Sequence, residues 1–176
     1  MVPIIKYVTV CILLIFVLYT DTKKYTIYNS VIILFSCIGL VLNYIESGYI
    51  GLINWFIGLI LPIIILFILF MLRTIGAGDI KLIAVISSLL GINFIVQASI
   101  YILISATIMS IIKMIINRNL FIRIKHFFNF IHNIIINKEV GIYDELNKGD
   151  KNKIIRLSYA ISIGTIYQII ADLKIL

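Results

Sequence analysis

The chain has 176 residues, of which 62% are hydrophobic and only 13% are charged. This balance excludes an ordinary water-soluble domain, because such a domain does not need so much apolar surface. The net charge of +7 does not indicate nucleic-acid binding, since the basic residues lie between apolar runs, where membrane topology explains them. Several of these runs reach the ~20 residues that cross a bilayer as a helix, so we expect an all-α membrane protein.

Six apolar segments follow one another along the chain, and each is interpreted as a transmembrane helix. They cover residues 4–19, 27–44, 50–72, 80–91, 94–116 and 154–170. A polar insert, 117–153, separates the last two. Its first half carries apolar residues at helical spacing, which predicts an amphipathic helix on the membrane surface. We therefore expect a single polytopic domain over 1–176, with about six transmembrane helices and a cytoplasmic amphipathic helix.

The basic residues predict how the chain is oriented, because cytoplasmic loops carry an excess of Lys and Arg. All but two of the 15 Lys and Arg residues fall on one side of the six-helix arrangement, and the exceptions are Lys6 and Lys174. That side is predicted to be the cytoplasm, with both termini outside. The polar loop 20–26, which carries Asp21, and the junction that carries Asp79 then lie at the same cytoplasmic face.

These two aspartates are the strongest chemical signal in the sequence. Asp79 belongs to the segment 76–82, Gly-Ala-Gly-Asp-Ile-Lys-Leu. A carboxylate next to lipid hydrocarbon is costly and therefore indicates function. Two Asp side chains can hydrolyse a peptide bond without a metal: one takes a proton from water, and the other, protonated, donates to the carbonyl oxygen. Two ionised carboxylates ~5 Å apart repel each other by roughly 3 kcal/mol, which favours a state in which the pair shares one proton.

The residues alone leave other interpretations open. Asp79 precedes an apolar run and could be a helix N-cap, for which Asp is preferred, or it could pair with a lysine. Lys81 could anchor the chain at the cytoplasmic face or tune the acid pair by its charge. Both aspartates could instead be ion or proton sites of a small coupled transporter, although no inverted repeat supports that alternative.

Segment 76–82 resembles the GxGD motif of the type IV prepilin peptidase family of membrane aspartyl proteases. Residues 21–29, Asp-Thr-Lys-Lys-Tyr-Thr-Ile-Tyr-Asn, resemble the family's other aspartate motif, in which Ile-Pro-Asn follows Asp at the same spacing. Ile27 and Asn29 match that motif, and Tyr28 replaces its proline. Residues 156–164, Arg-Leu-Ser-Tyr-Ala-Ile-Ser-Ile-Gly, resemble the family's final helix without its usual proline.

By this resemblance, Asp21 and Asp79 are the catalytic pair. Gly76 and Gly78 are the motif glycines, which allow a strained loop and a close approach of the substrate backbone. The implied activity is that of an aspartic endopeptidase in the cytoplasmic membrane, which cuts the basic leader from prepilins or pilin-like precursors during pilus biogenesis and protein secretion.

The same resemblance sets expectations for partners and cofactors. Larger family members carry a methyltransferase domain, often with a cysteine zinc site, and this chain has neither the length nor the cysteines for one. We therefore expect the short, peptidase-only form, with no metal or other cofactor. Its expected partners are the precursor protein and membrane lipid, and the sequence leaves the oligomeric state open.

Overall fold

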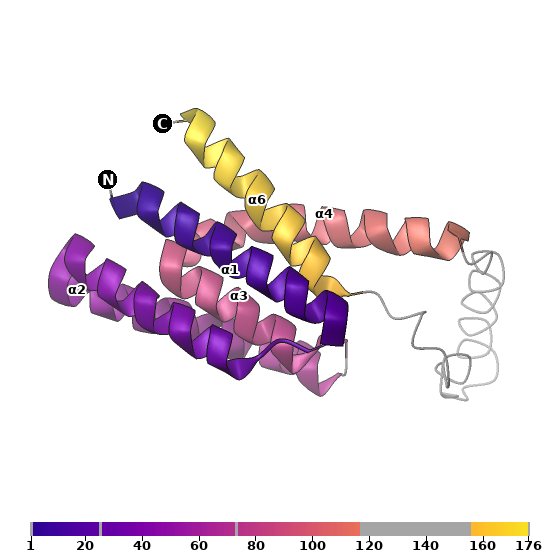
Figure 1. Cartoon of the computed structure of the whole chain (residues 1–176), viewed down its shortest axis with the longest axis horizontal. Helices are drawn as coiled ribbons and strands as arrows, with labels where there is room; N and C mark the ends of the chain where they lie inside the picture. The colour runs from indigo at the N-terminus through magenta and orange to yellow at the C-terminus, as the bar shows by residue number, and fades with distance from the viewer. Residues whose placement is uncertain (1, 25, 73, 117–155, 176) are drawn as a thin grey trace, which may run out of the picture. The chain divides into compact units, whose positions relative to one another are not determined.

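The computed structural model describes residues 2–24, 26–72, 74–116 and 156–175 (Figure 1). In chain order they form α1 (Val2–Lys24), α2 (Asn29–Met71), α3 (Ala77–Leu90), α4 (Ile92–Ile116) and α6 (Leu157–Ile175). No strand occurs in these ranges, so the predicted all-α class is confirmed for them. The predicted insert 117–153, with its amphipathic helix, lies outside the described residues.

The chain divides into two compact units. The first contains residues 1–106 and 156–176. The second contains residues 107–155, of which the structure describes the final turns of α4, 107–116. Both aspartates and every contact discussed below belong to the first unit. The expectation of a single domain over 1–176 stays a prediction.

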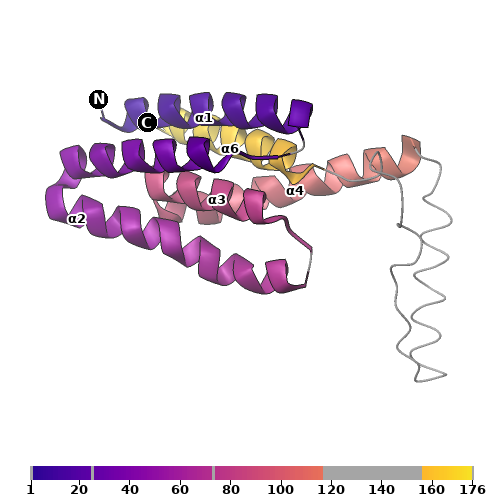
Figure 2. The same cartoon turned by 60° about the horizontal axis from the view of Figure 1, so that its bottom comes forward.

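Among the helices that the structure describes, α1, α2 and α4 are long and apolar enough to cross a membrane. α2 has 43 residues, about twice what one crossing needs, and it folds back on itself at Gly48 (Figure 2). Gly48 has φ 57° and ψ −131°, a left-handed conformation that favours glycine. The predicted gap between residues 44 and 50 is therefore reduced to one non-helical residue, which joins a first arm, 29–47, to a second arm, 49–71.

α3 is the central helix of the first unit, although it is the shortest. Its 14 residues reach about 21 Å, which is less than the ~30 Å of a hydrocarbon core. It contacts α1, α2 and α6, and Leu82, Ile86 and Leu89 on it are fully buried. A Cβ on Gly58 of the second arm would lie 2.6 Å from the backbone oxygen of Ser87, so the two helices pack backbone to backbone.

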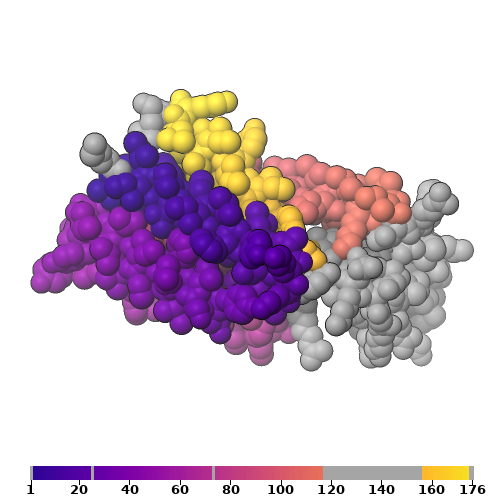
Figure 3. All heavy atoms as spheres, in the orientation of Figure 1, coloured from indigo at the N-terminus to yellow at the C-terminus, as the bar shows by residue number. Residues whose placement is uncertain are grey.

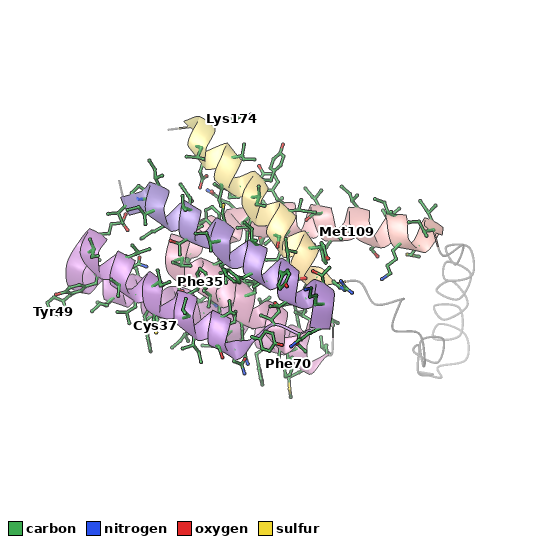
Figure 4. The ribbon with its side chains drawn as sticks, in the orientation of Figure 1. Phe35, Cys37, Tyr49, Phe70, Met109 and Lys174 are labelled. Atoms are coloured by element: carbon green, nitrogen blue, oxygen red, sulfur yellow. The ribbon has the colours of Figure 1, made fainter. Side chains whose placement is uncertain are left out.

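Large apolar side chains remain exposed on the outer faces of the helices. Ile64 and Ile68 on the second arm are about two-thirds exposed, and Tyr49, at the turn after Gly48, is 80% exposed (Figure 4). The space-filling view shows α1 lying between the first arm of α2 and α6, with side chains filling the space between them (Figure 3). Apolar outer faces around a packed interior fit contact with lipid rather than with water.

An ion pair between a buried lysine and an exposed glutamate stabilises the end of the first unit opposite to Asp21. The ammonium of Lys6, on the second turn of α1, contacts the carboxylate of Glu46 and donates a 2.9 Å hydrogen bond to Oδ1 of Asn43. The amide of Asn43 in turn donates to the backbone oxygen of Ser88 at 3.0 Å. This Lys6 cluster therefore ties α1, α2 and α3 together, and a cavity of about 310 Å³ adjoins it.

The start of α1 and the end of α6 meet at this same end of the unit. The hydroxyl of Tyr7 donates to Oδ2 of Asp172 at 3.4 Å. The amide of Gln168 donates to Oδ1 of Asp172 at 2.8 Å and to Oε1 of Gln97 on α4 at 2.9 Å. These bonds connect α1, α4 and α6 at this end of the unit. Asp21 lies at the other end of α1.

Candidate active site

Asp21 lies in the last turn of α1, where its side chain is buried. The predicted polar loop 20–26 is wrong for residues 20–24, because the helix continues to Lys24. The threonines beside the acid satisfy their hydroxyls within the helix: Thr20 donates to the carbonyl of Val17 at 3.0 Å. A polar helix end of this kind has the composition of a loop, which is why the sequence pattern placed the boundary too early.

Asp79 lies in the first turn of α3, as its third residue. The alternative that Asp79 is the N-cap is wrong, since Gly76 occupies that position with an extended backbone. The backbone of Gly76 hydrogen-bonds to the carboxylate of Asp79, as an acidic residue three positions into a helix does in a capping box. A Cβ on Gly76 would lie 3.1 Å from Oδ2 of Asp79, so the glycine lets the carboxylate fold back over the helix start.

The two aspartates interact electrostatically. Burial raises the pKa of Asp79 to about 6, and the charge of Asp21 adds to the rise, while the hydrogen bond from Gly76 opposes it. Asp79 is half-buried, and it lies outside the three helices that are long enough to cross a membrane. A carboxyl group with a raised pKa beside a second carboxyl group is what one shared proton requires.

The two motif segments are also joined directly. Gly78 lies against Ile27, since a Cβ on Gly78 would be 3.3 Å from Cδ1 of that side chain. The ammonium of Lys81 donates a 2.9 Å hydrogen bond to Oδ1 of Asn29 at the start of α2. Both residues that match the first motif, Ile27 and Asn29, therefore contact the second motif. Lys81 was expected as an anchor or a tuning charge, and the structure adds this bond to Asn29.

A residue that sequence reasoning did not select completes the site. Ser158, in the first turn of α6, is 1% exposed, and its hydroxyl donates a hydrogen bond to Oδ2 of Asp21. The two residues are 137 positions apart. A serine in an apolar helix gives no chemical signal of its own, and the resemblance of 156–164 to a final helix was the available pointer to this region.

The site has the parts for acid–base chemistry with water. Asp79, whose pKa is raised, lies in the first turn of α3 and interacts with the charge of Asp21. The buried hydroxyl of Ser158 donates a hydrogen bond to Asp21. Across the described ranges, no three His, Cys, Asp or Glu side chains gather as the ligands of a metal would. The arrangement can hold a proton on Asp79 while Asp21 accepts one from water.

Apolar helices and a pair of aspartates at their ends define the class of this chain: a helical membrane protein with a two-carboxylate site. Residues 8–115 match the type IV leader peptidase family. The match covers more than half of the chain and includes both aspartates, so the chain belongs to this family, as the resemblance predicted. Membership indicates a protease and gives no support to the transporter alternative. The chain shows no significant match to a curated protein or to a solved structure.

Proposed function

We propose that the chain is an aspartic endopeptidase that cuts the basic leader from type IV prepilin or pilin-like precursors, with Asp21 and Asp79 as its catalytic pair. Family membership supports a protease. The observation that carries the aspartic mechanism is the pairing of two carboxyl groups, one at the end of α1 and one at the start of α3, where burial and the charge of Asp21 raise the pKa of Asp79 to about 6. A shared proton between two carboxyl groups is what distinguishes an aspartic peptidase from one that uses a nucleophilic side chain or a metal.

In this mechanism Asp79 is the general acid and Asp21 is the general base. Asp21 takes a proton from water as the water oxygen attacks the scissile carbonyl carbon, and Asp79 donates its proton to the carbonyl oxygen. The resulting diol breaks its carbon–nitrogen bond as Asp21 passes the proton to the leaving nitrogen. Asp79 regains a proton from one hydroxyl of the diol, so both aspartates return to their starting states.

We further propose about six membrane-embedded segments, with the acid pair facing the cytoplasm and both termini outside. The segments are α1, the two arms of α2, α3 from residue 80 onward, α4 and α6, so that Asp79 lies at the membrane edge rather than within a segment. The bond from Tyr7 to Asp172 supports this topology, because it brings the start of α1 and the end of α6 together. The end of the unit that holds the acid pair also carries basic residues next to the aspartates in the chain: Lys23, Lys24 and Lys81. The positive-inside rule predicts such an excess of basic residues at a cytoplasmic face.

The proposed substrate class fits this placement of the acids. In a precursor with a basic leader followed by an apolar helix, the junction between leader and helix lies where the helix enters the bilayer. An acid pair at the cytoplasmic end of α1 and at the start of α3 would meet that junction from the water side. The partners are then the precursor and the surrounding lipid, and the reaction needs no cofactor.

Co-expression with a pilin precursor tests the proposal. We expect processing by the wild-type chain and none by Asp21→Asn or Asp79→Asn. Asp172→Asn is the matched control, because it makes the same change on α6 at the opposite end of the unit and should leave processing intact. Full processing by either of the first two variants would remove the mechanism.

A further inference from the structure

We propose that Ser158 is a positioning residue, whose hydroxyl holds the carboxylate of Asp21 in the orientation that lets it accept a proton from the hydrolytic water. The inference rests on the proposed function and adds a third residue, from a third helix, to the acid pair.

The first step is the contact itself. Ser158 donates to Oδ2 of Asp21, and both side chains are buried, at 1% and 9% exposure. A carboxylate in a fixed hydrogen bond loses the freedom to rotate about its side-chain bonds. A general base must lie within hydrogen-bond reach of the proton that it takes, and a displacement of about 1 Å can cost roughly 100-fold in rate.

The second step is the place of Ser158 in its helix. Ser162 and Thr165 lie on the same buried side of α6, and their hydroxyls donate to carbonyls four residues earlier in the helix, at 2.8 and 2.6 Å. α6 begins at Leu157, so Ser158 lies in its first turn, and its hydroxyl donates to Asp21 on α1. Of these three hydroxyls, the one in the first turn is therefore the one that reaches another helix.

The third step is the rigid support behind Ser158. A Cβ on Gly164 would lie 2.5 Å from the backbone nitrogen of Ile102, so α6 packs on α4 without a side chain between them. The hydroxyl of Ser105 on α4 also donates to the backbone oxygen of Ala160 at 3.0 Å. The close contact and the hydrogen bond fix the first two turns of α6, and with them the hydroxyl that Asp21 contacts.

The test compares Ser158→Ala with Ser162→Ala in purified protein. Each variant removes one buried hydroxyl from α6, but Ser162 has no bond to Asp21. The substrate is a synthetic precursor with a lysine-rich leader followed by an apolar helix. We expect Ser158→Ala to lower kcat by about 10- to 100-fold with KM unchanged, Ser162→Ala to stay within about twofold of wild type, and Ser158→Thr, which keeps the hydroxyl, to recover most of the rate.

The outcomes separate this inference from the function that it rests on. A wild-type chain that leaves the precursor uncut overturns the proposed function and the role of Ser158 with it. A wild-type chain that cuts, with Ser158→Ala as active as Ser162→Ala, overturns the positioning role alone. If Ser158→Ala does not fold, Ser158→Cys gives the same comparison, because a thiol fills the space but is a weak donor.

Discussion

Replacing Asp79 with Asn should stabilise the fold above about pH 6 and have little effect near pH 4. The wild-type carboxyl group must ionise next to Asp21 and partly out of water, whereas the amide of Asn carries no charge. In the folded chain the pKa of Asp79 is raised from 3.8 to about 6. The folded state therefore holds this proton more tightly than the unfolded state, so wild-type stability falls as the pH rises from about 4 to about 6 and then stays level.

The size of the effect follows from that shift. A difference of about two pKa units corresponds to about 3 kcal/mol, and the partial exposure of Asp79 lets solvent screen it to about 2 kcal/mol. In a chain of this length, 1 kcal/mol moves the Tm by roughly 2–4 °C. We expect the Tm of Asp79→Asn to exceed that of wild type by about 4–8 °C more at pH 8 than at pH 4.

The assay is thermal unfolding of the purified protein in detergent at the two pH values. The same measurement in an Asp21→Asn background isolates the interaction between the two acids. There the gain from Asp79→Asn should shrink but persist, since burial is the larger cause of the raised pKa and the charge of Asp21 is the second. An equal gain with and without Asp21 would refute the interaction, and an equal gain at pH 4 and pH 8 would refute the raised pKa.

Three further predictions concern the reaction and the packing. The cleavage rate of the wild-type chain should fall above about pH 6, approaching tenfold per pH unit, because Asp79 loses its proton; a rate that is constant from pH 6 to 8 contradicts its role as the acid. Gly58→Ala should cost about 1–3 kcal/mol, since its Cβ would meet a backbone oxygen at 2.6 Å. Gly48→Ala should also cost about 1–3 kcal/mol, but for a different reason, because φ 57° with ψ −131° is a backbone conformation that L side chains rarely adopt. Thermal unfolding that shows no loss of Tm in either variant would contradict the account of that glycine. Glu46→Ala should cost about 1–3 kcal/mol, because the buried ammonium of Lys6 loses its counter-charge and keeps only its hydrogen bond to Asn43, and Lys6→Met in the same chain should restore most of the Tm.

The sequence predicted those features that depend on local pattern. Long apolar runs dictate helices, because a backbone in lipid must satisfy its own hydrogen bonds. The start of α3 was predicted three residues too late, at 80, and the strained loop expected at Gly76 and Gly78 is wrong, because α3 begins at Ala77 and Gly78 is helical. The end of α1 was predicted too early, since Thr20 and Asp21 have the polarity of a loop but remain helical. The gap before residue 50 was predicted too long, because one glycine with a positive φ is enough to reverse the chain.

The features that escaped prediction depend on contacts between distant positions. Ser158 meets Asp21 across 137 residues, and Lys6 meets Glu46 across 40. Neither contact leaves a local pattern, because the packing of α6 and the reversal of α2 bring the partners together. The interaction of Asp21 with Asp79 could be predicted in kind, since it follows from the antiparallel order of the helices. The pKa of Asp79 depends on burial, which only the folded chain defines.

The sharp reversals at Gly48 and Gly91 make the two ends of the first unit unequal. Gly48 interrupts α2 as a single residue, and Gly91, with φ 92°, is the lone residue between α3 and α4. Both reversals lie at the end that holds Lys6, whereas the connections before α2 and α3 lie at the end that holds the aspartates. A protease added to the Lys6 side of sealed vesicles would therefore find almost no non-helical backbone to cut between α1 and α4. On the opposite side, the described non-helical residues 26–28 and 74–76 offer a protease backbone to cut, and cleavage there would report which way the chain is inserted.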